Sequence, residues 1–303
     1  GSIGDGGTRP APALRGIESR LMAGKAGRDP VSAIAEDAAT GETAEIFADI
    51  RATMEIPLIT SIWRTLYDVP GGLAPAWKLA KPIYETGQPA AALARVVAQA
   101  DLPVPAPLVP GQLACAGVSV DDLGAIRAIV DAYNRSNGMN MVALTAVVVP
   151  PAGSTFGDPG PADAVPDAPD WPELRPLLGQ EDIAPTAWQL LNQIRHLGSQ
   201  GAPKDNAVLA TLWRHLAHWP GLLALIQTGF APLREDGTIM AAFGQVHALA
   251  QAEGARLAHL RPSGPTLPKE AEVMIARYVG SPMAVAHMVT LGHALAKWLV
   301  PND

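Results

Sequence analysis

The sequence predicts an all-α protein made of two related helical halves that pack as a pseudo-dimer around a central pocket. Three observations predict this fold. Apolar residues recur at helical spacing along most of the chain, no segment shows the sustained alternation of a half-buried strand, and several motifs of the first half return in order in the second. With 303 residues, of which 48% are hydrophobic, the chain can bury a large core.

Composition shifts divide the chain into four parts. We expect an N-terminal tail over 1–30, a first helical repeat over 31–148, a linker over 149–176 and a second helical repeat over 177–303. The tail is rich in Gly, Pro and Ala, which is typical of a partly disordered terminus. The linker is rich in Pro, Gly and Asp, as exposed connections are.

Helical spacing predicts the elements of the first repeat in turn. Helices are expected over 41–54, between Pro57 and Pro70, over 74–84 and over 90–100. The alternating prolines of 102–110 exclude a helix there, because each removes a donor and restricts the backbone. Ser119 followed by Asp122 predicts the N-cap of a helix that runs through Tyr133. Helical patterns resume after the linker and continue almost to the C-terminus.

An internal repeat supports the two-half organisation. The string SIWRTLYDVPGGLA (61–74) is answered by TLWRHLAHWPGLLA (211–224), and MVAL (141–144) by MVTL (288–291). IFADIR (46–51) is likewise answered by LLNQIR (190–195). Two copies of one helical unit that pack together bury apolar faces and tend to leave a pocket at their interface.

Charge and cysteine usage exclude several classes of partner. The net charge is -7 and no Lys/Arg stripe is present, so nucleic acid is not an expected partner. The longest apolar run, 141–151, is about half of what a membrane span needs. The single cysteine, Cys115, cannot form an internal disulfide, and no signal-peptide pattern opens the chain, so we expect a cytoplasmic protein.

Several strings resemble the group I 2-haloacid dehalogenases. GETAEIFADIRATMEIPLI (41–59), YDVPGGLAPAWK (67–78) and AYNRSNGMNMVALTAV (132–147) are similar to the first half of that family, and LWRHLAHWPGLL (212–223) is similar to the matching part of its second half. The resemblance spans roughly 41–297. It implies an all-α fold of two repeats in which an aspartate activates the water that displaces halide from a 2-haloalkanoate. It also implies that neither a metal nor an organic cofactor is needed.

The resemblance assigns roles residue by residue. Asn137 matches the asparagine that holds the attacking water, and Asn134 matches a second asparagine of the family. The anchor Leu-Ala-x-Trp-Pro aligns Thr211 with a serine and Leu212 with the catalytic aspartate. Leu58 and Ser61 fall on the family's pocket tryptophan and phenylalanine, so both are expected to contact the substrate. Tyr278 and His287 lie in the last helices, which in the family help to line the pocket.

The alignment leaves the identity of the catalytic base open. Leucine at position 212 cannot accept a proton. Asp205 can stand in for the aspartate if a gap follows it, whereas the repeat comparison makes 199–206 an extra surface loop. His215 and His218 have a spacing that could hold a metal, but no third ligand is identifiable, so no metal site is predicted.

The sequence therefore predicts a dehalogenase-like protein that takes a small-molecule ligand or substrate. One hypothesis is a cofactor-free hydrolase of a small 2-substituted carboxylic acid, with Asn137 orienting water and Asp205 as base. The alternative is a non-catalytic homologue that binds a small ligand or fills its pocket with side chains. A carboxylate near a water held by Asn137 would favour the hydrolase. The sequence is compatible with a monomer or a homodimer.

Overall fold

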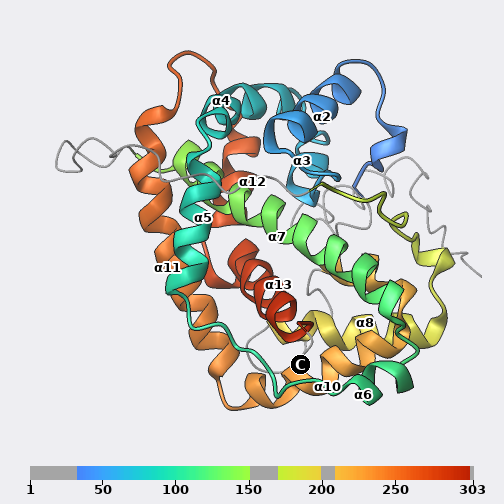
Figure 1. Cartoon of the computed structure of the whole chain (residues 1–303). Coiled ribbons are helices and arrows are strands. Elements are labelled where there is room, and N and C mark those ends of the chain that lie inside the picture. The colour runs from blue at the N-terminus through green and yellow to red at the C-terminus, as the bar shows by residue number, and fades with distance from the viewer. Residues whose placement is uncertain (1–32, 151–169, 199–208, 301–303) are drawn as a thin grey trace, which may run out of the picture.

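The computed structural model describes residues 33–150, 170–198 and 209–300, and Figure 1 shows their arrangement. Every regular element within these ranges is a helix, and none is a strand, which confirms the all-α class. The predicted tail, most of the predicted linker and Asp205 lie outside the described residues.

The elements of the first predicted repeat are η2 (Glu36–Ala38), α2 (Gly41–Met54), α3 (Ser61–Leu66), α4 (Leu73–Glu85), α5 (Gln88–Gln99), α6 (Pro110–Cys115) and α7 (Val120–Val148). The boundaries of α2, α4 and α5 agree with the sequence prediction to within two residues. The stretch 102–109 is not helical, and Pro110 opens α6 at a position where its missing N–H costs nothing.

Helix α7 is the longest helix of the described chain and crosses the middle of the molecule (Figure 1). It begins as predicted with a capping box, in which the Ser119 hydroxyl and the Asp122 carboxylate each accept the other residue's backbone N–H. The prediction that this helix ends at Tyr133 is wrong, because it continues to Val148. Its second half, 138–147, is buried throughout, so packing compensates for the low helix propensity of Asn and Gly there.

The second predicted repeat is also helical. Its elements are η3 (Gln180–Asp182), α8 (Pro185–Ile194), η4 (Arg195–Gly198), α9 (Thr211–His215), η5 (Leu216–His218), α10 (Pro220–Glu235), α11 (Thr238–Leu257), η6 (Ala258–Leu260), α12 (Lys269–Val279), η7 (Pro282–Ala286) and α13 (His287–Trp298). The described segment 170–179 contains no helix.

Two apolar clusters hold the fold together around α7, which packs against α5, α11, α12 and α13. Trp63 lies in the first cluster and Trp213 in the second, and both side chains are almost fully buried. Each cluster draws helices from both predicted repeats, since α11 and α12 contribute to the first and the N-terminal half of α7 to the second. Burial of aromatic side chains of this size is a major source of stability.

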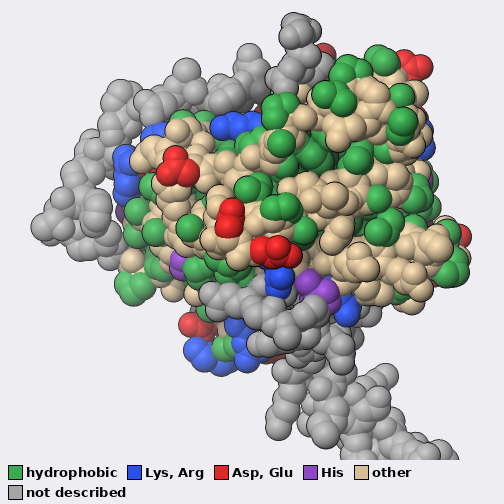
Figure 2. Space-filling view, turned by 90° about the horizontal axis from the view of Figure 1, so that it is seen from below, with side chains coloured by type: hydrophobic (Ala, Val, Ile, Leu, Met, Phe, Trp, Pro, Cys, Tyr) green, Lys and Arg blue, Asp and Glu red, His purple; other side chains and the backbone are tan. Residues whose placement is uncertain are grey.

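The surface carries no single-sign stripe on the face drawn in Figure 2, where charged side chains stand in small groups among hydrophobic and other side chains. None of the helices in the described ranges is long and apolar enough to cross a membrane.

Candidate functional site

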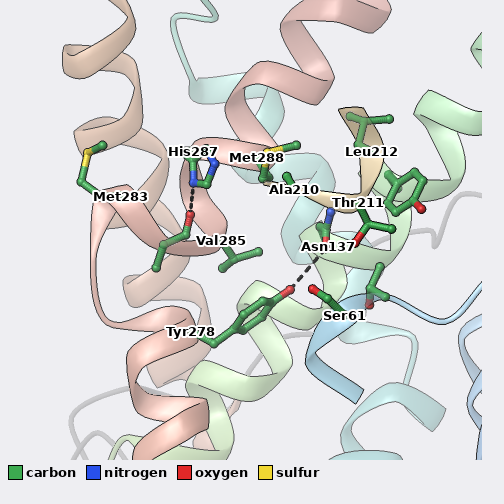
Figure 3. Close-up of a pocket in the computed structure, with 13 residues that line it drawn as sticks. Ser61, Asn137, Ala210, Thr211, Leu212, Tyr278, Met283, Val285, His287 and Met288 are labelled. Carbon is green, nitrogen blue, oxygen red and sulfur yellow. Dashed lines mark hydrogen bonds between the residues drawn. The ribbon is translucent and has the colours of Figure 1, made fainter. Parts of the chain in front are cut away.

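A cavity of about 210 Å³ lies where the starts of α3 and α9, the middle of α7, the end of α12 and the junction of η7 with α13 meet (Figure 3). Its lining consists of Thr60, Ser61, Tyr133, Asn137, Ala210, Thr211, Leu212, Tyr278, Met283, Ala284, Val285, His287 and Met288. The wall is mostly apolar with a few polar groups, which is the usual character of a small-molecule site.

The repeat motif supplies two sides of this cavity. Ser61 and Thr211 are equivalent positions of the predicted repeat, and each is the first residue of a short helix that has no side-chain cap. The hydroxyl oxygen of Thr211 is buried and has no hydrogen-bond partner among the residues that the structure describes. A buried hydroxyl without a partner carries a desolvation penalty, and a ligand that bonds to it would remove this penalty.

Asn137 presents its amide from the middle of α7. The Tyr278 hydroxyl donates to Asn137 Oδ1 at 3.3 Å, which directs the amide nitrogen Nδ2 to the other side (Figure 3). Burial raises the pKa of Tyr278, so its hydroxyl stays protonated and remains a donor. No hydrogen bond within the described ranges uses Nδ2, so this group is available to donate into the cavity.

Behind the lining, Asn140 joins four side chains into a buried polar network. Its Oδ1 accepts from Trp63 Nε1 at 3.1 Å and from the Tyr84 hydroxyl at 2.7 Å, and its Nδ2 donates to Thr60 Oγ1 at 2.8 Å. Thr60 is also bonded to the Ser136 hydroxyl at 3.2 Å. A satisfied network of this kind is rigid, so it fixes Thr60 at the cavity wall.

The fourth side of the cavity is a turn of π-helix, η7. The Ser281 hydroxyl caps it by accepting from Met283 N at 3.0 Å, and Ala284 has a non-helical backbone with φ −87° and ψ −137°. This kink lies inside η7, and Met283, Val285 and His287 on either side of it all line the cavity. Single π-helical turns and irregular backbone are frequent at functional sites.

His287 has two ring nitrogens in different situations. Nδ1 donates to the carbonyl of Ala284, so the neutral ring carries its lone pair on Nε2. Burial lowers the pKa of His287, which keeps the ring neutral at pH 7. The ring is held between Phe243, whose centroid lies 5.8 Å away, and Gly198, where an added Cβ would come within 2.6 Å of His287 Cδ2.

Two buried arginines act electrostatically on Tyr133, which forms part of the cavity wall. Arg64 and Arg214 are equivalent positions of the repeat and are 3% and 6% exposed. Burial raises the pKa of Tyr133, and the charges of both arginines oppose that rise while Glu36 reinforces it. The described lining itself contains no charged side chain, and the charges of Arg64, Arg214 and Glu36 act on it through Tyr133.

The structure brings five of the predicted site residues to this cavity, namely Ser61, Asn137, Thr211, Leu212 and Tyr278. His287, which the sequence also indicated, lies there too. Two other predicted substrate contacts, Leu58 and Asn134, are buried outside the lining, with Leu58 in the second apolar cluster and Asn134 against Gly292 of α13. Tyr133 was missed, although it stands four residues before Asn137 and therefore on the same face of α7.

The two histidines with metal-like spacing bond to the backbone instead. His215 Nε2 lies 2.6 Å from the carbonyl oxygen of Arg175, and His218 Nε2 lies 2.8 Å from that of Pro176. The residues that the structure describes contain no group of three His, Cys, Asp or Glu side chains suited to a metal ion.

Comparison with solved structures finds the same architecture in D-2-haloacid dehalogenases. Similar structures include a D-2-haloacid dehalogenase mutant (TM-score 0.69), the enzyme in complex with L-LA (0.67) and a mutant in complex with D-2-CPA (0.66). Each is 16% identical to this chain, and each match covers 91% of this chain and 97% of the other. No known protein family and no curated protein matches the sequence. The chain thus has the fold of the D-2-haloacid dehalogenases.

Proposed function

We propose that this chain is a dehalogenase-like protein whose cavity binds a small 2-substituted carboxylic acid. The observation that carries the proposal is the fixed amide of Asn137, whose oxygen is occupied by Tyr278 and whose nitrogen is free to donate. The unpaired hydroxyl of Thr211 lines the same cavity, as does Ser61. Together they offer hydrogen-bond donors to a carboxylate, and such bonds favour its ionised form.

Charge, polarity and size support the same class of ligand. Arg64 and Arg214 place positive charge behind Tyr133, which favours an anion in an otherwise uncharged cavity. Leu212 and Val285 offer apolar surface to the substituent on the second carbon. A volume of about 210 Å³ exceeds the roughly 30 Å³ of one water several times, so a ligand of a few heavy atoms and a water fit together. Similar structures hold D-2-CPA and L-LA.

Hydrolysis is the second candidate function, and the position of Asn137 favours it. The resemblance gives that asparagine the task of holding the attacking water. Leu212, which aligns with the catalytic aspartate, lines the cavity and is 1% exposed, and a leucine cannot take up a proton. The described lining includes no carboxylate, and Asp205 lies outside the described ranges. Ligand binding therefore needs no further group, whereas hydrolysis needs a base other than residue 212.

Calorimetric titration with both enantiomers of 2-chloropropionate and of lactate tests the binding proposal. We expect saturable binding, weakened about tenfold or more in Asn137→Ala, since a hydrogen bond to a charged group contributes about 1.5–3 kcal/mol. Thr211→Val, which keeps the side-chain shape, should weaken binding by a smaller factor. Asn192→Ala on α8 is the matched control, because Asn192 does not line the cavity. Absence of binding, or binding that ignores both cavity variants, would refute the proposal.

A further inference from the structure

We propose that His287 is the general base of this cavity and takes the role that Leu212 cannot take. Its Nε2 would accept a proton from the water that displaces the halide of a bound 2-haloalkanoate. This inference rests on the proposed function, because the substrate must first bind beside Asn137.

The tautomer of His287 is fixed by the backbone around it. Nδ1 donates to the carbonyl of Ala284, three residues earlier, and Ala284 is the residue at which the helical backbone is broken. The lone pair therefore sits on Nε2. Within the described ranges no hydrogen bond reaches Nε2, and it is not among the side-chain atoms buried without a partner. A proton acceptor oriented by a second hydrogen bond is the arrangement that general-base catalysis requires.

Asn137 and His287 supply the two contacts that an attacking water needs. Both line the cavity from different helices, and Figure 3 shows them on either side of Met288 and Ala210. Asn137 Nδ2 carries two N–H groups, so one can donate to the water oxygen while the other donates to the substrate carboxylate, and a water proton then points to His287 Nε2. The hydroxyls of Ser61 and Thr211 remain for the substrate carboxylate. Leu212 and Val285 exclude bulk water, which strengthens these polar interactions.

The step balances without any further reactant. The water oxygen forms a bond to the second carbon of the acid while the carbon–halogen bond breaks, and the halide leaves with the bonding electron pair. One water proton moves to His287 Nε2. The product is the 2-hydroxy acid with inverted configuration at the second carbon, and the imidazolium returns the proton to solvent. Neither an oxidant nor a reductant is consumed.

The environment of His287 keeps this base ready at neutral pH. Burial lowers the pKa of the ring from its usual 6.5, so the ring is deprotonated at pH 7. The helices packed against η7 are α7, α11, α12 and α13. Apart from His287 itself, their titratable side chains on the lining are Tyr133 and Tyr278, which burial keeps protonated and neutral. The other titratable side chains of these helices do not line the cavity; they are Asp121, Asp122, Arg127, Asp131 and Arg135 of α7, His247, Glu253 and Arg256 of α11, Lys269, Glu270, Glu272 and Arg277 of α12, and His293 and Lys297 of α13. Turnover should therefore hold from neutral pH to below 6.5 and then fall as Nε2 becomes protonated.

Gly198 gives a second way to test the position of the ring. A Cβ at this residue would lie 2.6 Å from His287 Cδ2 and 3.1 Å from Nε2, closer than side chains pack. Gly198→Ala therefore keeps the imidazole but shifts its reactive edge. A misplacement of about 1 Å can reduce a rate about a hundredfold.

The test follows halide release from each enantiomer of 2-chloropropionate, with ligand binding measured by calorimetry on the same samples. We expect the wild type to release halide and His287→Gln to lower kcat about a hundredfold or more while the Kd changes less than about threefold. Gly198→Ala should lower kcat about tenfold or more at similar Kd. His259→Gln, which replaces an exposed histidine of η6, is the matched control and should leave both unchanged.

Each outcome separates the base from the binding site. Binding by the wild type without halide release, or undiminished release by His287→Gln, overturns the role of His287 and leaves the proposed ligand intact. If no haloacid binds, the proposed function itself fails. Loss of the fall in turnover below pH 6.5 in a still active His287→Gln variant would support the base directly.

Discussion

Asn140 and His287 each stand one residue before a matching string, MVAL (141–144) and MVTL (288–291), so they are equivalent positions of the predicted repeat. Asn140 is fully buried and uses both ends of its amide, accepting from Trp63 and Tyr84 and donating to Thr60. His287 lines the cavity, its Nδ1 donates to the carbonyl of Ala284, and no hydrogen bond within the described ranges reaches its Nε2. The first copy thus uses its polar group to hold the fold, and the second leaves it available to a ligand.

The same asymmetry appears in the distribution of histidine. All seven histidines lie after the predicted linker, and none lies before it. Three of them, His215, His287 and His293, have a pKa lowered by burial. Acid should therefore affect the second half of the chain before the first, because protonation of these rings is opposed by their surroundings.

The largest expected effect comes from His215 and His293, since burial lowers the pKa of each to about 4 from 6.5. Between these values the unfolded chain binds protons that the folded protein does not, so this stability is fully present above pH 6.5 and is lost as the pH falls. The loss is about 3 kcal/mol for each ring by pH 4. Urea unfolding at pH 7 and pH 4 measures it, with His293→Gln expected to lose less on acidification.

Hydrogen exchange shows where that loss falls. Near pH 4, amides of α9 and α13 should lose protection before those of α2 and α4. The control is His259→Gln, which alters an exposed ring. Earlier loss of protection in α2 and α4 would contradict the asymmetry.

The next largest effect is expected at Asn140. Asn140→Leu keeps the approximate side-chain volume but leaves the Trp63 indole and the Tyr84 hydroxyl without their acceptor. Each buried donor left unpaired costs about 1–3 kcal/mol, so the free energy of unfolding should fall by about 3 kcal/mol. The matched change His287→Leu should lower the free energy of unfolding by less than about 1 kcal/mol, because only the hydrogen bond to the carbonyl of Ala284 is lost. Equal losses in chemical denaturation would remove the distinction between the two positions.

Local patterns explain why much of the fold was predictable. The boundaries of α2, α4 and α5 follow from apolar spacing and from Gly and Pro at their ends, which act within a few residues. The continuation of α7 past Tyr133 was not predictable in this way. Asn134 and Asn137 favour a helix end locally, and only the packing of α11 and α13 against this segment makes the helix favourable.

Some residues of the candidate site could likewise be predicted from the sequence, and others could not. Residues such as Asn137 and Thr211 could be placed because they stand in motifs whose order resembles a known family. Leu58 and Asn134 stand in the same motifs and yet lie outside the lining, because their side chains pack into a core and against Gly292. The free Nε2 of His287 depends on a kink at Ala284, for which the local sequence, with Ser281 and Pro282 before it, gives no specific signal.

A smaller effect on stability than that of Asn140→Leu is expected from restoring a carboxylate at the cavity. Leu212→Asp places an acid where the structure has an apolar wall, so we expect the free energy of unfolding to fall by about 2 kcal/mol at pH 7. Leu212→Asn is the matched control, because asparagine has the same shape as aspartate but carries no charge. If Asn137 donates to water held by the new carboxylate, halide release should rise above that of Leu212→Asn.

A double variant that combines Leu212→Asp with His287→Gln compares the introduced carboxylate with His287 as the base. In the double variant the carboxylate at 212 can accept the proton, so halide release should persist where His287→Gln alone has lost it. A double variant that folds and binds 2-chloropropionate but releases no halide would mean that residue 212 does not face the attacking water. The position of Leu212 beside Thr211 on the lining argues that it does, because both residues belong to the turn that opens α9 onto the cavity.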